Sequence, residues 1–351
     1  MTSWFANPAA RRWSVVGEAP AVRDFHRTLP GYAPTPLVDL PALAEELGVG
    51  RVLVKDESSR LGLPAFKILG ASWACRRVLD RQPGAVLVTA TDGNHGRAVA
   101  RVAKQLGTTA TVFVPRVMPE STAGLIASEG AEVVRVDGDY DDAVRAAAAH
   151  AEADPGRALV QDTAWEGYEQ VPQDIVDGYA TLLAEVDEEL GRQPDLVAVP
   201  VGVGSLAQAV VAHYRRGSDD STDHNEADHP TRVLSVEPDT AACLLASLAA
   251  GSPVAVPTGA TVMAGLNCGT VSSLAWPVLS AGCDAAVAVT DDEALAASRD
   301  LEGLGVSSGP CGAATLAGVR AALSDPARCA DLALPADAVL VLLSTEGLDS
   351  A

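Results

Sequence analysis

Lys67 is the residue whose type most directly suggests covalent chemistry. It lies in "GLPAFKILGAS", residues 62–72, and it is one of three lysines, with Lys55 and Lys104, among 25 basic residues. Arginine stays protonated, with a pKa near ~13, and cannot attack a carbonyl carbon. A lysine among apolar neighbours has a lowered pKa and can form a Schiff base. We therefore predict a nucleophilic Lys67 with a lowered pKa; a surface lysine whose stem packs on apolar side chains is the alternative.

A glycine-rich turn is the second candidate, for binding rather than for covalent chemistry. The stretch "GVGS", residues 202–205, follows an apolar run and, with Ala207, matches the pattern G-x-G-x-x-A. Such a turn lets a phosphate approach the free N–H groups at the start of a helix. With Glu237 as a ribose-binding acid it would also suit a nicotinamide dehydrogenase. A tight turn without a ligand is the simpler alternative.

Polar residues also follow three other apolar runs. The stretch "TDGNHG", residues 91–96, could hold a carboxylate through backbone N–H groups and the Asn94 amide, or be an ordinary turn capped by Asp92 or Asn94. Asp162 follows an apolar run and could equally be a helix cap or one half of an ion pair. Ser344 ends a very apolar run, where its hydroxyl needs a hydrogen-bond partner.

These residues must be positioned by strands that alternate with helices. Each short apolar run precedes an alanine-rich stretch of helical pattern, and Thr290 and Glu293 fit a capping box at one helix start. Strands that are apolar on both faces indicate parallel sheets covered by helices, so we predict an α/β fold with functional residues at the carboxyl ends of the strands. The predicted strands are residues 85–89, 110–115, 132–136, 196–201, 232–238, 285–290 and 338–344.

Composition excludes several classes of function. The chain has 351 residues, 48% of them hydrophobic, and a formal net charge of −21, which disfavours binding to nucleic acid or to an anionic membrane. No apolar run reaches the ~18–20 residues of a membrane helix, and the first residues lack a secretory signal pattern. Six scattered cysteines without a CxxC pair indicate free thiols and no metal site. We expect a cytoplasmic protein with an acidic surface loop at residues 217–231.

Five motifs carry a family resemblance that covers almost the whole chain: "KDESSRLGLPAFK", "TDGNHGRAVA", "QDTAWEGYEQVP", "VEPD" and "MAGLNCG". With them, the chain resembles the fold-type-II pyridoxal-phosphate enzymes, the tryptophan-synthase-β-like group, and within it the diaminopropionate ammonia-lyase family. The resemblance implies elimination of ammonia from 2,3-diaminopropionate, with pyridoxal 5'-phosphate as cofactor, to give pyruvate and ammonia. Serine/threonine-type dehydratases and β-replacement enzymes of the same fold, and a catalytically silent amino-acid-binding paralogue, remain alternatives.

The resemblance also implies roles for individual residues. Lys67 would bond covalently to the cofactor, Ser344 would face its pyridine nitrogen, and Asp92 and Asp162 would be acid–base groups on opposite faces of the substrate Cα. The implied cofactor-binding residues are Phe66, Lys67, Asn94, Gly202, Val203, Gly204, Ser205, Leu206 and Ser344. The implied substrate-binding residues are Thr91, Asp92, Gly93, His95 and Asp162.

The resemblance finally implies two domains and departs from its pattern at two positions. We expect a large cofactor-binding domain of residues 1–70 and 163–351, and a small inserted domain of residues 71–162, with the active site between them. A homodimer acting on a small amino-acid substrate is expected. Pro64 stands where relatives have asparagine and Ala71 where they have glycine; because proline fixes φ and lacks an N–H, the loop before Lys67 differs from the pattern.

Overall fold

The computed structural model describes residues 3–17, 21–91, 93–217 and 230–348, which form two compact units. The large unit comprises Met1–Pro20, Pro34–Ser59 and Leu182–Asp349, and the small unit comprises Ala21–Ala33 and Arg60–Thr181. The small unit thus also takes in residues on either side of 71–162, and the predicted domain boundaries stay a prediction. The acidic loop predicted at 217–231 lies almost entirely outside the described residues.

The large unit is built on a mainly parallel sheet. Its central strands are apolar on both faces, and β8, β9 and β11 are buried at every position. Among the described residues the strand order is β1 (Trp4–Ala6), β10 (Ala285–Val289), β9 (Arg232–Pro238), β8 (Leu196–Pro200), β11 (Val339–Ser344), β3 (Arg51–Asp56) and β2 (Leu37–Asp39). The two edge strands, β1 and β2, run antiparallel to their neighbours and all other pairs are parallel. The predicted α/β class with mainly parallel sheets is confirmed.

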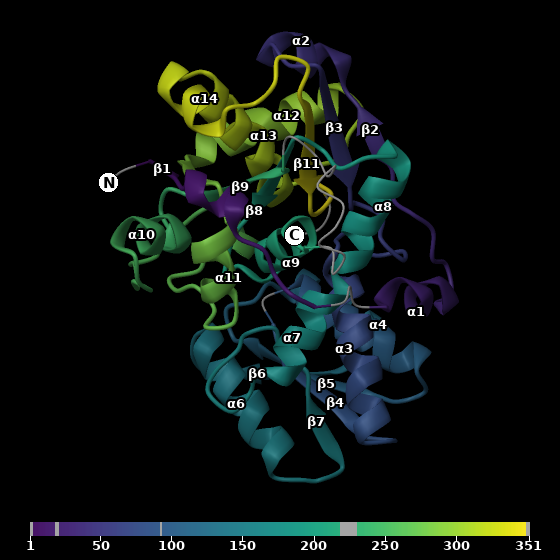
Figure 1. Ribbon diagram of the computed structural model, residues 1–351. Coiled ribbons are helices and arrows are strands. Elements are labelled where there is room, and N and C mark those ends of the chain that lie inside the picture. The colour runs from purple at the N-terminus through teal and green to yellow at the C-terminus, as the bar shows by residue number, and fades with distance from the viewer. Residues whose placement is uncertain (1–2, 18–20, 92, 218–229, 349–351) are drawn as a thin grey trace. The chain divides into compact units, whose positions relative to one another are not determined.

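Helices cover this sheet, and β2, β8, β9 and β10 are each followed along the chain by a helix of the same unit. α13 (Pro310–Leu323) contacts β8, β9, β10 and β11, and it lies beside α12 (Asp291–Gly303), as Figure 1 shows. The predicted capping box begins α12: Glu293 N donates to Thr290 Oγ1 and Thr290 N donates to the Glu293 carboxylate. The other helices here are α2 (Pro41–Leu47), α8 (Ala180–Leu190), α9 (Ser205–Tyr214), α10 (Cys243–Ala250), α11 (Ala275–Gly282) and α14 (Pro326–Leu332), with 3-10 turns at Pro8–Arg12 and Ala264–Leu266.

The small unit has a parallel sheet of its own. In the part of the chain that is described, its strand order is β6 (Glu132–Val136), β5 (Ala110–Pro115), β4 (Val86–Ala90) and β7 (Arg157–Leu159). Its helices are α1 (Val22–Thr28), α3 (Lys67–Arg81), α4 (Asn94–Gln105), α5 (Glu120–Ser128), α6 (Tyr140–Glu152) and α7 (Gln170–Gly178). Because β4 and β7 are parallel neighbours, the residues that follow them meet at one edge of the sheet.

Over residues 3–17, 21–91, 93–217 and 230–348, no helix combines the length and the apolar character needed to cross a membrane.

Candidate active site

Lys67 forms an ion pair with Asp162 in the small unit. Lys67 is the first residue of α3, Asp162 follows β7, and Nζ lies 2.7 Å from Oδ2. The two side chains are 31% and 13% exposed, so the pair is largely shielded from water. From the sequence, Asp162 could have been one half of an ion pair. The structure shows this ion pair, and its other half is Lys67.

The charges of this pair set both pKa values. Burial by itself lowers the pKa of Lys67, but the Asp162 carboxylate outweighs burial, and the net pKa is raised. Burial likewise favours the neutral form of Asp162, yet the charge of Lys67 holds its pKa well below the usual range. The predicted lowered pKa of Lys67 is therefore wrong for the paired amine, because its apolar sequence neighbours gave no sign of a carboxylate 95 positions away.

The other two lysines are placed very differently. Lys55 is fully buried in β3 and donates to Glu185 Oε2 and to the carbonyl oxygen of Thr35, both at 2.7 Å. Lys104 is exposed on α4. Lys67 is thus the lysine whose amine is both partly accessible and next to a carboxylate.

Gln161 holds Asp162 in place and was not identified from the sequence. Its Nε2 donates to Asp162 Oδ1 at 3.2 Å and to the Tyr140 hydroxyl at 2.9 Å, while its Oε1 accepts the N–H of Ala90 at 2.9 Å. The Gln161 backbone N–H donates to the hydroxyl of Tyr168 at 2.8 Å. The position of Gln161, directly before Asp162 in the "QDTAWEGY" motif, was the available signal.

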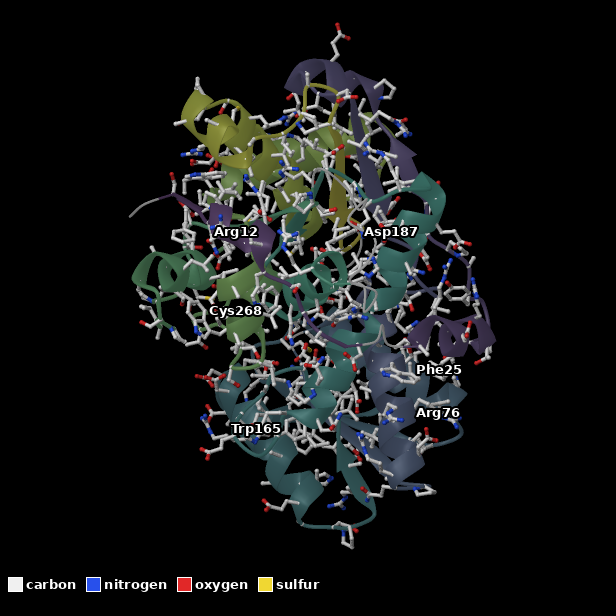
Figure 2. The ribbon with its side chains drawn as sticks, viewed as in Figure 1. Arg12, Phe25, Arg76, Trp165, Asp187 and Cys268 are labelled. Carbon is white, nitrogen blue, oxygen red and sulfur yellow. The ribbon has the colours of Figure 1, made fainter. Side chains whose placement is uncertain are left out.

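The loop between β7 and α7 is closed by two aromatic residues. Trp165, labelled in Figure 2, stacks on Tyr168 with ring centroids 4.4 Å apart. The Tyr168 hydroxyl donates to the Leu159 carbonyl oxygen at 3.0 Å. The Tyr168 hydroxyl therefore holds the backbone on both sides of Val160, directly before Asp162. This contact helps to keep the Asp162 carboxylate in one orientation.

The turn at residues 91–96 is organised by Thr91. Its Oγ1 accepts the N–H groups of Gly93 at 2.9 Å and Gly96 at 3.1 Å, and α4 begins at Asn94. Thr91, whose predicted role was substrate binding, therefore satisfies two N–H groups at the start of α4. Asp92, a predicted catalytic and substrate-binding residue, lies outside the described residues.

His95 joins the pair from the start of α4. Its Nε2 lies 2.9 Å from the Val160 carbonyl oxygen, and its Nδ1 lies 3.9 Å from Asp162 Oδ2. The small unit therefore brings together Lys67, His95 and Asp162, three of the predicted site residues, at the edge where β4 and β7 end. Phe66, another predicted residue, packs on Tyr179 with ring centroids 4.8 Å apart.

In the large unit, the glycine turn connects β8 to α9 as predicted. Gly204 has φ of +101°, a conformation that favours glycine, and a Cβ there would lie 2.8 Å from Leu279 Cδ1. A Cβ at Gly202 would lie 3.0 Å from the Gly265 carbonyl oxygen and 3.1 Å from Cys268 Sγ. Among the described residues no side chain caps α9, which begins at Ser205. The turn thus lies beside a helix N-terminus, where a phosphate group could approach free N–H groups.

Ser344 ends β11 at the same edge of the large sheet. It is fully buried, and its hydroxyl donates to the hydroxyl of Ser308 at 2.7 Å. Since β11 and β8 are parallel neighbours, their carboxyl ends lie at the same edge of the sheet. Ser344, at the end of β11, and the glycine turn after β8 therefore lie at that edge. Ser308, the partner that the Ser344 hydroxyl required, stands in "VSSGPCG" and carried no recognised signal.

Glu237, the possible ribose-binding acid of the dehydrogenase alternative, has a structural role in the large unit. Its two carboxyl oxygens accept the N–H groups of Leu244 and Leu245, each at 2.7 Å, and so cap α10. The side chain is completely buried, and burial raises its pKa to about 8, against the lowering effect of the two backbone N–H groups. Both oxygens are therefore engaged in holding a helix, which argues against a dinucleotide site.

The raised pKa of Glu237 predicts a pH dependence of stability. Between pH 5 and 8 the folded protein retains a proton that the unfolded chain has released, so the free energy of unfolding falls as the pH rises. Glutamine at position 237 cannot titrate. The free energy of unfolding of the wild type minus that of Glu237→Gln should therefore fall by roughly 3–5 kcal/mol from pH 5 to pH 8. Urea unfolding at pH 5, 6.5 and 8 measures it, with Glu302→Gln, at an exposed position of α12, as control. A difference that stays constant with pH contradicts the prediction.

The cysteines show no cross-links. All six are free thiols, as predicted, and Cys243 Sγ contacts the Gly202 carbonyl oxygen at 3.6 Å. Within the described ranges, no group of three or more His, Cys, Asp or Glu side chains could hold a metal ion.

The chain is similar to known proteins over most of its length. The family model for pyridoxal-phosphate dependent enzymes matches residues 28–344. The diaminopropionate ammonia-lyase of Escherichia coli K12 is 36% identical over 94% of this chain and 88% of its own length, and that of Salmonella typhimurium is 38% identical over 82% and 74%. The crystal structure of the E. coli enzyme with an aminoacrylate-PLP azomethine reaction intermediate has a TM-score of 0.82 and 35% identity, covering 99% of this chain and 90% of that one.

Proposed function

We propose that this chain, which belongs to the pyridoxal-phosphate-dependent enzymes and within them to the diaminopropionate ammonia-lyase family, eliminates ammonia from 2,3-diaminopropionate. The products are pyruvate and ammonia. The single observation that carries the proposal is the half-buried Lys67 amine 2.7 Å from Asp162. A covalent anchor and a base are thereby available side by side, on the motifs shared with that family.

The residues present fit the cofactor. Lys67 Nζ would hold it covalently, the glycine turn and the first N–H groups of α9 would bind its phosphate, and Ser344 would face its pyridine nitrogen. When bound, pyridoxal phosphate supplies the electron sink for the charge that develops at the substrate Cα. The residues proposed to contact it are Phe66, Lys67, Asn94, Gly202, Val203, Gly204, Ser205, Leu206 and Ser344.

Asp162 is proposed as a base whose strength depends on Lys67. The Lys67 charge holds the pKa of Asp162 low, and burial acts in the opposite direction. When Lys67 no longer carries its charge beside Asp162, the effect of burial on the pKa of Asp162 weighs more, and the carboxylate becomes a stronger base than it is beside the lysine ammonium. Asp162 then takes the Cα proton, the released electron pair forms the Cα–Cβ double bond, and the Cβ–N bond breaks with its pair remaining on nitrogen.

The turn at residues 91–96 is proposed to hold the substrate carboxylate. Its N–H groups lie at the start of the 12-residue α4, where the helix dipole favours negative charge. Thr91 and Gly93 shape the turn, and Asp92 is proposed as the acid–base group on the other face of Cα. A second carboxylate allows both enantiomers to be deprotonated without a large movement of either.

Ser344 is proposed to bias the chemistry towards elimination. Its hydroxyl hydrogen-bonds but, unlike a carboxylate, does not stabilise a protonated pyridine nitrogen. Less negative charge then accumulates at Cα, which disfavours racemisation and transamination. We further propose, on the family resemblance, that the protein is a cytoplasmic homodimer that degrades amino acids.

Product analysis tests the proposed function. The purified protein, loaded with pyridoxal phosphate, is incubated with D- and L-2,3-diaminopropionate, L-serine and L-threonine, and pyruvate or 2-oxobutyrate and ammonia are measured. We expect pyruvate with two ammonia per diaminopropionate, and a larger kcat/KM for this substrate than for serine or threonine. Preferred turnover of serine or threonine would identify a dehydratase, and no turnover of any substrate would identify a silent paralogue.

A further inference from the structure

His95 carries an unpaired nitrogen in a buried position. Its side chain is 4% exposed, and its Nε2 lies 2.9 Å from the Val160 carbonyl oxygen. Because a carbonyl oxygen only accepts, Nε2 must carry the hydrogen, and in the neutral ring Nδ1 is left as an acceptor. Within the described part of the chain Nδ1 is buried and has no hydrogen-bond partner. A buried acceptor without a partner is uncommon and calls for a donor.

The unpaired nitrogen lies near a carboxylate oxygen that already accepts a hydrogen bond from an ammonium. Nδ1 is 3.9 Å from Asp162 Oδ2, and the same Oδ2 accepts the Lys67 ammonium at 2.7 Å. The other oxygen, Oδ1, accepts from Gln161 Nε2 at 3.2 Å. Asp162 Oδ2, which follows β7, and His95 Nδ1, at the start of α4, are therefore two neighbouring acceptors. Two neighbouring acceptors suit a primary ammonium, which has several N–H donors.

We propose that His95 Nδ1 and Asp162 Oδ2 together accept hydrogen bonds from the ammonium on Cβ of the substrate, and so select diamino acids over hydroxy amino acids. This inference rests on the proposed function, in which Lys67 bonds to the cofactor and no longer needs Asp162. An ammonium has three N–H donors and can serve both acceptors, whereas the single O–H of serine leaves one of them unpaired. The group then departs as NH₃, retaining the electron pair of the Cβ–N bond.

Two substitutions separate the two nitrogens of His95. In His95→Gln the amide can keep the donor to Val160 but has no acceptor in the place of Nδ1; in His95→Asn the side-chain oxygen can replace Nδ1 while the donor to Val160 is lost. The ratio of kcat/KM for L-2,3-diaminopropionate to that for L-serine is measured for each. We expect the ratio to fall roughly 10- to 100-fold in His95→Gln and to fall less in His95→Asn.

The ¹⁵N spectrum of the imidazole gives a readout that does not depend on turnover. In ¹⁵N-histidine-labelled protein, the His95 signals are assigned by their loss in whichever of His95→Gln and His95→Asn folds. We expect the ring hydrogen on Nε2 and none on Nδ1, the tautomer that the contact with the Val160 carbonyl oxygen requires. Protonation at Nδ1 overturns the inference even if a variant fails to fold.

Kinetic outcomes distinguish the inference from the function on which it rests. An unchanged selectivity ratio in a folded His95→Gln, with diaminopropionate still turned over by the wild type, overturns the inference alone. Equal losses of the ratio in both variants, with equal losses of melting temperature, indicate a packing role and also overturn it. A wild-type protein inactive on diaminopropionate overturns the proposed function and the inference with it.

Discussion

Lys67→Ala is expected to abolish covalent binding of pyridoxal phosphate, so that the fraction of protein labelled falls from near one to near zero. The wild-type protein, reduced with borohydride and digested, should carry pyridoxyl on the peptide with Lys67. The physical reason is accessibility: Lys67 is half-buried beside one carboxylate, whereas Lys55 is sealed between Glu185 and Thr35. Visible absorbance and peptide mapping measure the result.

Two variants control for effects other than loss of the nucleophile. Lys67→Arg keeps a cation next to Asp162 but cannot form the bond, so it should lose the label while keeping more of the melting temperature than Lys67→Ala. Lys104→Ala, at an exposed position of α4, should keep both. Recovery of the label on Lys55 or Lys104 in the wild type would refute the assignment of Lys67.

Structural features that depend only on residues close together in the chain could be predicted from the sequence. The turn between β8 and α9 and the capping box of Thr290 and Glu293 are decided within a few residues, where strand pattern, glycine and cap follow one another. The alternation of doubly apolar strands with helices likewise determined the two mainly parallel sheets, because such strands must be covered on both faces.

Features that depend on long-range contacts could not be predicted in the same way. Lys67 and Asp162 were each identified as site residues, but nothing local shows that they form a 2.7 Å pair, and the pKa of Lys67 consequently moves opposite to the prediction. The task of Glu237 depends on the N–H groups of Leu244 and Leu245 pointing back at it. A strand-end acid looks the same in a sequence whether it caps a helix or binds a ribose.

Asp162→Asn is expected to reduce turnover of L-2,3-diaminopropionate by ~10²–10⁴-fold, the usual contribution of a positioned base. The amide keeps the size of the side chain and its contact with Gln161 but cannot take the Cα proton. We propose that Asp162 serves the L-isomer and Asp92 the D-isomer, so turnover of the D-isomer should fall much less. Asp92→Asn should show the reverse. Steady-state kinetics of both isomers measures these effects, and the cofactor absorbance should persist in both variants.

A purely structural role for the Lys67–Asp162 pair predicts a different result. Loss of an ion pair would lower the melting temperature and reduce turnover of both isomers by the same factor. Asp174→Asn is the matched control, because Asp174 is a buried carboxylate of the same unit, paired with Arg81 at 2.9 Å, and has no proposed part in the reaction. It should lower stability without changing the ratio of the two isomers. If Asp162→Asn behaves like Asp174→Asn, with parallel losses for the two isomers, then Asp162 is not the base for the L-isomer.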